Sequence, residues 1–270
     1  MLFASSAQAQ NLFVSSGSDI YEFTPSGARS TFASGVAYPG GMAFDSSGDL
    51  FVTDTGGNID KFTPDGVEST FATGLNFPLG LAFNSAGNLF EADGNGNKIY
   101  EFTPSGVRST FATGLGGVEA LAFDSAGDLF ASVPTGIIYK FTTNEVRSTF
   151  ATGLNGPAAL AFDSAGNLFE TDQGSDKIYK FTTKGVRSTF ASGLNNPVGL
   201  AIDSTDNVFE ADNSGYNINE FTPGGVESTF DSSVADPVYL VFQPVSVPEP
   251  SVFGLLAVGA TALFIRRRRC

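Results

Sequence analysis

The sequence predicts an all-β protein, a six-bladed β-propeller of four-stranded antiparallel blades. A segment of shared sequence returns at a spacing of about 40 residues, which indicates a repeat architecture. Its copies begin at Phe23, Phe62, Phe102, Phe141, Phe181 and Phe221. Each period holds four short runs of aromatic and β-branched residues bounded by turn residues, without a helical apolar stripe. Four strands per period are typical of a propeller blade.

The phenylalanines support the same strand count. Of the 27 in the chain, 23 fall on one fixed slot per strand when the six copies are stacked. Only Ile202 breaks this pattern, and Phe3, Phe77, Phe253 and Phe264 lie outside it. We therefore expect these rings to form the packing between blades.

The chain enters the propeller in the middle of a blade. The runs that start at Asn11 and Asp19 match the second and third strands of later copies, and the first strand is missing. It returns at the other end as residues 238–242. The C-terminal strand should therefore pair with the N-terminal blade and close the ring, which leaves only short outer edges. The six first strands expected around the channel are 41–44, 80–83, 120–123, 159–162, 199–202 and 239–242.

Alternation along each blade assigns the turns to two faces. The turns between strands one and two and between strands three and four share one face. The turns between strands two and three share the other face with the loops that lead from blade to blade. Gly, Pro, Asp and Asn dominate these turns because they favour turn conformations.

The two ends differ in composition from the repeat. Residues 1–10 contain Ala7-Gln8-Ala9, a small-x-small pattern that indicates the remnant of a signal peptide and predicts export. Residues 11–243 form the propeller and 244–250 a linker. Residues 251–265 are uncharged and mostly apolar, a little short of the roughly 20 residues that span a bilayer, and are expected to form a short transmembrane helix. Residues 266–270 form an Arg-rich tail, which predicts a cytoplasmic end.

The tail resembles the PEP-CTERM sorting signal of Gram-negative bacteria that make extracellular polysaccharide. The matching parts are Pro248, Glu249 and Pro250, then the apolar segment, then Arg266, Arg267, Arg268 and Arg269. The resemblance implies that an exosortase is a partner and removes the tail near the Pro-Glu-Pro motif. The protein would be anchored in the membrane before processing, and then lie at the cell surface or outside the cell.

Within the repeat, Gly-Leu-Ala-Phe followed by Asp-Ser-Ala-Gly-Asn and Leu-Phe-Glu-Ala-Asp is similar to the blades of NHL-type propellers. Streptogramin lyase and gluconolactonase-like propellers look related, and the resemblance covers residues 11–243. These families include ligand binders, lyases and lactonases, so the function must be argued from a site.

Composition excludes several classes of function. The net charge is −14, and without the four tail arginines the 28 acidic residues face 10 basic ones, so nucleic acid is not an expected partner. The chain has no His, and its one Cys is Cys270 at the end. Ser-His-Asp and Cys-His nucleophilic sites and the usual zinc sites are therefore excluded.

Acidic residues that end the second strand are candidate ligands for a divalent cation, although the sequence also allows no cofactor at all. They are Asp54, Asp93, Asp172 and Asp212, with Glu91, Glu170 and Glu210 two residues earlier in three blades. In position they are the nearest counterparts of the carboxylates that hold a metal in gluconolactonase-like enzymes, and they could form an acidic ring near the channel mouth. The alternative is an Asx turn, since the same residue type recurs in four blades. The first strands offer little buried polarity to tune a pKa, so no catalytic residue is predicted.

Candidate ligand-binding residues lie where the repeat breaks on the face of the inter-blade loops. The fourth blade departs most, at 116–119 and 131–135. The candidates mix aromatic rings, amides and carboxylates suited to carbohydrate or peptide contact: Tyr38, Phe77, Glu119, Asn155, Asn195, Tyr216 and Asp236. Drift between degenerate copies would produce the same differences.

The leading functional prediction is an exported, non-catalytic binding or structural module at the cell surface or in the extracellular matrix. Its partner would be an extracellular polysaccharide or a surface protein. The alternative is a metal-dependent lactonase-like hydrolase or a lyase.

Overall fold

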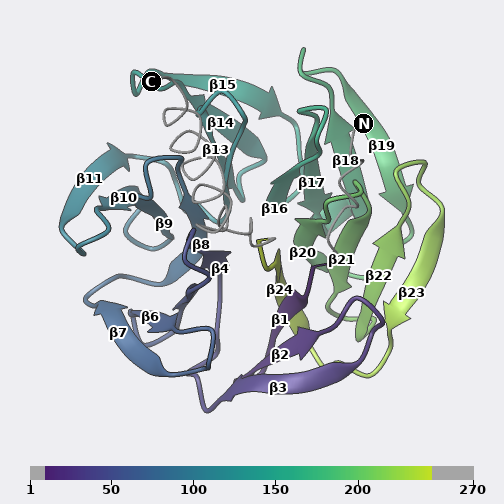
Figure 1. Ribbon diagram of the computed structural model, residues 1–270. Helices are drawn as coiled ribbons and strands as arrows, with labels where there is room; N and C mark the ends of the chain where they lie inside the picture. The colour runs from purple at the N-terminus through teal and green to yellow at the C-terminus, as the bar shows by residue number, and fades with distance from the viewer. Residues whose placement is uncertain (1–9, 245–270) are drawn as a thin grey trace, which may run out of the picture.

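A computed structural model describes residues 10–244 and confirms the six-bladed propeller, with six four-stranded antiparallel sheets around a central axis (Figure 1). Blade one consists of β24 (Pro237–Phe242), β1 (Leu12–Ser16), β2 (Asp19–Phe23) and β3 (Arg29–Ser34), from the inside outward. Blade two consists of β4 (Met42–Phe44), β5 (Leu50–Thr53), β6 (Ile59–Phe62) and β7 (Glu68–Ala72). Blade three consists of β8 (Pro78–Phe83), β9 (Leu89–Asp93), β10 (Lys98–Phe102) and β11 (Arg108–Thr113).

The other three blades repeat this order of strands. Blade four consists of β12 (Leu121–Phe123), β13 (Leu129–Val133), β14 (Ile137–Phe141) and β15 (Arg147–Thr152). Blade five consists of β16 (Pro157–Phe162), β17 (Leu168–Asp172), β18 (Lys177–Phe181) and β19 (Arg187–Ser192), with a 3-10 turn at Gln173–Ser175. Blade six consists of β20 (Pro197–Ile202), β21 (Val208–Asp212), β22 (Asn217–Phe221) and β23 (Glu227–Asp231).

The predicted closure of the ring is present. Strand β24 pairs with β1, with Leu12 opposite Phe242 and Val14 opposite Leu240. The Gln243 N–H donates to the Asn11 carbonyl at 2.9 Å, and the Gln10 amide donates to the Gln243 carbonyl at 2.9 Å. The first and last segments therefore share one hydrogen-bonded blade.

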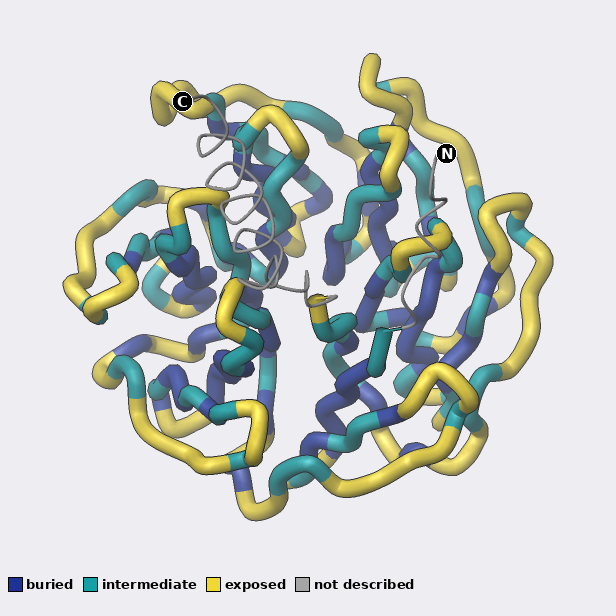
Figure 2. The backbone as a smooth tube through the Cα atoms, viewed as in Figure 1, coloured by how far each residue is buried: buried dark blue, intermediate teal, exposed yellow. Residues whose placement is uncertain are grey.

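Phenylalanine rings join neighbouring blades, as the fixed slot predicts. Phe51 of blade two lies 5.0 Å from Phe71 of its own blade and 5.1 Å from Phe83 of blade three, both in edge-to-face geometry. Phe71 in turn lies 5.8 Å from Phe102 of blade three. Edge-to-face pairs at these distances are the favoured arrangement of aromatic rings. Burial is greatest in the second strand of each blade, such as β9, and the outermost strands are largely exposed (Figure 2).

Small residues and hydroxyl groups allow the inner strands of adjacent blades to approach closely. A Cβ atom at Gly80 would lie 2.6 Å from the Glu119 carbonyl oxygen of the next blade. The Thr53 hydroxyl donates to the Leu79 carbonyl of the next blade at 2.9 Å. The Ser132 hydroxyl likewise accepts from Ala120 N–H and donates to the Ala158 carbonyl of blade five. Backbone of one blade is thus hydrogen-bonded to side chains of the previous one.

None of the helical turns within residues 10–244 is long and apolar enough to cross a membrane. The predicted transmembrane segment, the sorting motif and the signal-peptide remnant up to residue 9 lie outside the described residues.

Candidate functional site

The loops that lead from one blade to the next share a left-handed backbone position directly before the first strand. The six residues at this position have positive φ: Tyr38 (51°), Phe77 (61°), Gly117 (88°), Gly156 (70°), Asn196 (62°) and Asp236 (50°). Gly, Asn and Asp adopt this conformation readily, whereas a bulky residue does so at a cost. Tyr38 and Phe77 are thus the two strained members of the set.

Tyr216 repeats this situation in the hairpin between β21 and β22. Its φ is 58°, and the equivalent position in other blades holds Gly57, Asn97, Gly136 and Asp176. The side chain of Tyr216 is 53% exposed, against 72% for Tyr38 and 49% for Phe77. These three are the exposed aromatic side chains of residues 10–244, and all three occupy left-handed positions. Strained backbone that carries an exposed ring is a feature of binding sites rather than of packing.

The other predicted loop residues lie on the same face. Asn155, Asn195 and Asp236 are exposed. The backbone N–H of Asn155 donates to the Asp172 carboxylate at 2.8 Å, and that of Asn195 to the Asp212 carboxylate at 2.8 Å. Their loops are therefore held in place while the residues face solvent.

The four aspartates at the end of the second strand anchor loops. Asp54 accepts from the Asn58 N–H at 2.8 Å, and Asp93 accepts from the Asn76 N–H at 2.5 Å. With Asp172 and Asp212 they are all buried, each in its own blade. Residues 10–244 contain no group of three or more acidic side chains that could hold a metal ion. A divalent cation at these four aspartates stays a prediction.

The glutamates that precede these aspartates correct one expectation. Glu91, Glu170 and Glu210 are fully buried rather than at the channel mouth. Glu91 points to the same side of its strand as Leu89, which packs against Phe51 and Ile59 of blade two, so it lies between blades. Both carboxylate oxygens of Glu91 and of Glu170 have no hydrogen-bond partner.

Burial raises the pKa of Glu91 and of Glu170 to about 9, and a nearby aspartate adds to the rise. Burial raises the pKa of Glu210 to about 8, although it accepts a hydrogen bond from the Asn219 amide at 3.1 Å. These groups are protonated at neutral pH, since the folded protein disfavours their charged form. The expectation of little buried polarity concerned the first strands, and these buried glutamates lie on the second strands, for which no such prediction was made. The sequence does indicate that these glutamates are buried, because the same strand position holds Val14, Val52 and Ala131 in the other blades.

Glu119 and Tyr239 bring polar chemistry to the central channel. Glu119 directly precedes the small residue of its first strand and is half-buried, and this burial raises its pKa to about 7. Tyr239 of blade one fills the slot that Gly or Ala holds in the other five blades. Burial, and then the charge of Glu119, raises the pKa of Tyr239. Sequence reasoning did not select Tyr239, although its size in a small-residue slot is visible in the sequence.

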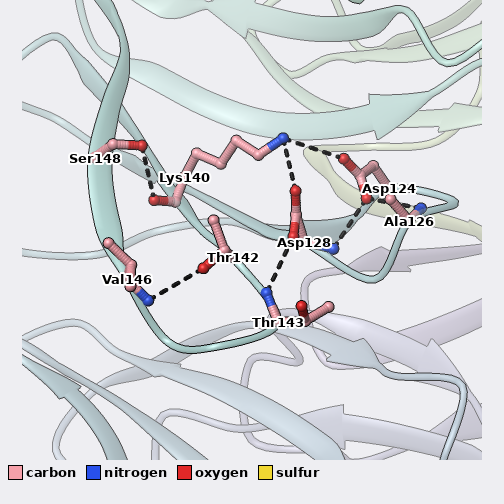
Figure 3. Close-up of polar contacts among 8 residues, drawn as sticks. All are labelled: Asp124, Ala126, Asp128, Lys140, Thr142, Thr143, Val146 and Ser148. Atoms are coloured by element: carbon pink, nitrogen blue, oxygen red, sulfur yellow. Dashed lines mark hydrogen bonds and ion pairs between the residues drawn. The ribbon is translucent and has the colours of Figure 1, made fainter.

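Grooves on the opposite face were not predicted. They lie between adjacent blades, with volumes of about 260 Å³ between blades six and one and about 520 Å³ between blades two and three. In blade four a lysine crosses this face: Lys140 lies 2.8 Å from Asp128 and 3.5 Å from Asp124 (Figure 3). Its ammonium nitrogen is 5.0 Å from the centre of the Phe130 ring.

Comparison with known proteins matches residues 246–269 to the PEP-CTERM protein-sorting motif. The chain is therefore an exported protein, anchored in the membrane at its C-terminal end before exosortase processing and then located at the cell surface. A search of curated proteins found no significant match.

Solved structures share the fold at low identity. A chain of a nidogen/laminin complex is 18% identical, with a TM-score of 0.81, and the match covers 88% of this chain and 100% of that one. Virginiamycin B lyase from Staphylococcus aureus is 19% identical, with a TM-score of 0.64 and coverage of 74% and 73%. A putative gluconolactonase is 16% identical, with a TM-score of 0.66 and coverage of 76% and 80%. At these identities the likeness establishes the fold, and function must come from the residues of this chain.

Proposed function

We propose that the protein is a non-catalytic binding module of the cell surface, whose inter-blade loop face binds an extracellular polysaccharide or a surface protein. The observation that carries this proposal is the placement of Tyr38, Phe77 and Tyr216. Each exposes a large ring at a backbone position where Gly, Asn or Asp serves in other blades. Exposed rings provide apolar contact area at low entropic cost, which is why they are enriched at interfaces.

The arrangement around the ring supports one extended site. Tyr38 enters blade two, Phe77 enters blade three, and Tyr216 belongs to blade six, which is next to blade one. The rings therefore span the sector from blade six through blades one and two to blade three. The sector ends next to blade four, whose entry loop carries Gly116 and Gly117 and so offers no side chain to a ligand there. An elongated ligand such as a glycan chain or an extended peptide suits this spacing.

The test replaces Tyr38 and Phe77 by Asn, a residue that the chain itself uses at this position in Asn196. Binding of the purified protein to a glycan array and to extracted surface proteins should fall at least tenfold for whichever ligand the wild type binds. Folding should be preserved or improved, because Asn accepts φ > 0 more readily. The matched control is Val107→Thr, which removes an exposed apolar side chain from the turn between β10 and β11. Unchanged affinity in the double variant would contradict the proposal.

A second candidate, a lactonase-like hydrolase or a lyase, rests on Glu119. A half-buried carboxyl with a pKa of about 7 in the central channel suits a general acid or base. Such an enzyme should hydrolyse or eliminate a lactone substrate in the presence of calcium, magnesium or zinc, and Glu119→Gln should remove the activity. Loss of activity in Glu119→Gln with intact glycan or protein binding would assign catalysis to the channel and recognition to the rings.

A further inference from the structure

The groove between blades six and one combines aromatic walls with two carboxylates. Phe209, Phe230 and Phe242 line its wall, and Asp203 and Glu220 lie beside them. The groove has a volume of about 260 Å³ and opens on the face opposite the inter-blade loops. It is thus independent of the ligand face proposed above.

Blade five shows what this arrangement does elsewhere in the same chain. Asp163 accepts from the Asn167 N–H and side-chain amide, both at 2.7 Å, which fixes the turn. Lys180 then places its ammonium nitrogen 3.1 Å from the Asp163 carboxylate and 4.7 Å from the centre of the Phe169 ring. The site is a cradle for an alkylammonium group, made by one turn carboxylate and one ring face.

Two other blades also place a lysine over the second-strand ring, but there two turn carboxylates contact its ammonium group. In blade two, Lys61 lies 2.7 Å from Asp49, 3.9 Å from Asp45 and 5.2 Å from the Phe51 ring centre. Lys140 of blade four is the third case. A lysine ammonium over the second-strand phenylalanine is therefore a recurring property of this fold position.

Blade six retains the cradle but lacks the lysine. Asp203 accepts from the Asn207 N–H at 2.9 Å and from its amide at 3.1 Å, as Asp163 does from Asn167, and Phe209 occupies the ring position. The residue equivalent to Lys180 is Glu220. The Asn207 amide is engaged by Asp203 and Thr205, so it does not bond to Glu220.

Glutamates occupy the lysine position in blades one and three as well, but there they are satisfied. Glu22 accepts from the Asn11 amide at 2.6 Å, and Glu101 accepts from the Asn88 amide at 2.7 Å. Blade three also has the neutral Asn84 where blade six has Asp203. Within residues 10–244, blade six alone of these three blades combines a turn carboxylate, a second carboxylate without a side-chain donor and an aromatic groove.

We propose that this groove binds the ammonium group of a lysine side chain from a partner polypeptide. The ammonium would lie between Asp203 and Glu220, with its alkyl stem along Phe209. An unbranched alkylammonium is favoured over an amino sugar because Lys61, Lys140 and Lys180 are the groups that fill the equivalent cradles. The net charge of −14 favours the approach of a cationic partner.

The test titrates the purified full chain with Nα-acetyl-lysine N-methylamide and follows binding by calorimetry. Wild type should bind one equivalent, and Glu220→Lys should weaken binding at least tenfold, because its own ammonium fills the cradle. Conversely, Lys180→Glu should create a second site. Glu68→Lys makes the same charge change on an exposed outer strand and should retain wild-type affinity.

Specificity comes from two further probes. The Nε-acetylated form of the lysine probe should not bind, since it lacks the charge, and glucosamine oligosaccharide should bind more weakly than lysine. Equal loss of affinity in Glu220→Lys and Glu68→Lys would show that net charge alone weakens lysine binding, and would contradict a site at Glu220. Stronger binding of the amino sugar would overturn the assignment of a polypeptide partner. If Lys180→Glu did not fold, the comparison of Glu220→Lys with Glu68→Lys would still decide the question.

Discussion

Replacing Glu170 by Val should make the propeller more stable at neutral pH. Glu170 is fully buried between blades, and neither carboxylate oxygen has a hydrogen-bond partner. The same strand position holds Val14 and Val52 in blades one and two, and both are fully buried. The substitution therefore places at position 170 a residue that the chain already buries at the equivalent position of two other blades.

The size of the effect follows from proton linkage. Burial on folding raises the pKa of Glu170 from its ordinary value of 4.5 to about 9. Between these values the folded protein holds a proton that the unfolded chain releases, so the free energy of unfolding falls as pH rises, by about 1.4 kcal/mol per pH unit. The contribution is fully present below pH 4.5 and is lost as pH rises through about 9. At pH 7 the wild type has lost about 3 kcal/mol of its free energy of unfolding through this group. Glu170→Val avoids that loss, but the small cavity that Val leaves costs about 1 kcal/mol.

The measurement is denaturant unfolding from pH 4 to pH 8, followed by circular dichroism. Wild type should lose stability steadily across this range, and Glu170→Val should show a shallower slope and cross wild type in mild acid. Glu68→Gln is the control, because it removes a carboxylate from an exposed outer strand without changing the packing between blades. Identical pH slopes for wild type and Glu170→Val would refute the reasoning.

Two other predictions concern the ends of the propeller. Deletion of residues 237–243 removes β24 and should lower stability by several kcal/mol or abolish folding, because it leaves β1 unpaired on its inner edge; a melting temperature within a degree or two of wild type would contradict the role of closure. Mass spectrometry of the protein from its native host should show a chain that ends near Pro248-Glu249-Pro250, and a mature chain that still ends in Cys270 would argue against processing.

The fold could be predicted from the sequence because each level of the repeat gives the same answer. The number of copies gives six blades, and the four strand runs per copy with one ring per strand give four-stranded blades. Closure was predictable from the split first blade, since the missing strand could be found by its residues. The pairing of Leu12 with Phe242 then follows from the pattern of the other blades.

The site was less predictable than the fold, because the sequence shows where a residue departs from the repeat but not which backbone conformation that residue adopts. Tyr38 and Phe77 could be selected as rings in loops, but their positive φ is a property of the backbone. The grooves arise where turns of two blades meet, and no single copy contains them. Glu220 could have been noticed from its alternation with Lys, but the open groove beside it could not.

The buried glutamates have different neighbouring groups in different blades. In blades three and five, the glutamate shares its sheet face with a tyrosine and an arginine, and the charge of Arg108 or Arg187 lowers the pKa that burial raises. The outer arginines stack on those tyrosines at 5.0 Å from the ring centres. Blade six has Asn219 and Glu227 in their places. There the Asn219 amide donates to Glu210, so a hydrogen bond replaces the attraction of the arginine.

A buried polar group with a structural role has a partner within its own blade, whereas a candidate binding group has none. Glu210 has no arginine at the position of Arg108 and Arg187, but the Asn219 amide of the same blade donates a hydrogen bond to it. Glu220, on the next strand of the same blade, occupies the position of a lysine in three blades and has no side-chain donor among residues 10–244. A carboxylate left without a donor inside the protein is satisfied by solvent or by a ligand. Since Glu220 lines a groove and Glu210 does not, the partner that Glu220 lacks within residues 10–244 is expected to be the proposed lysine ligand.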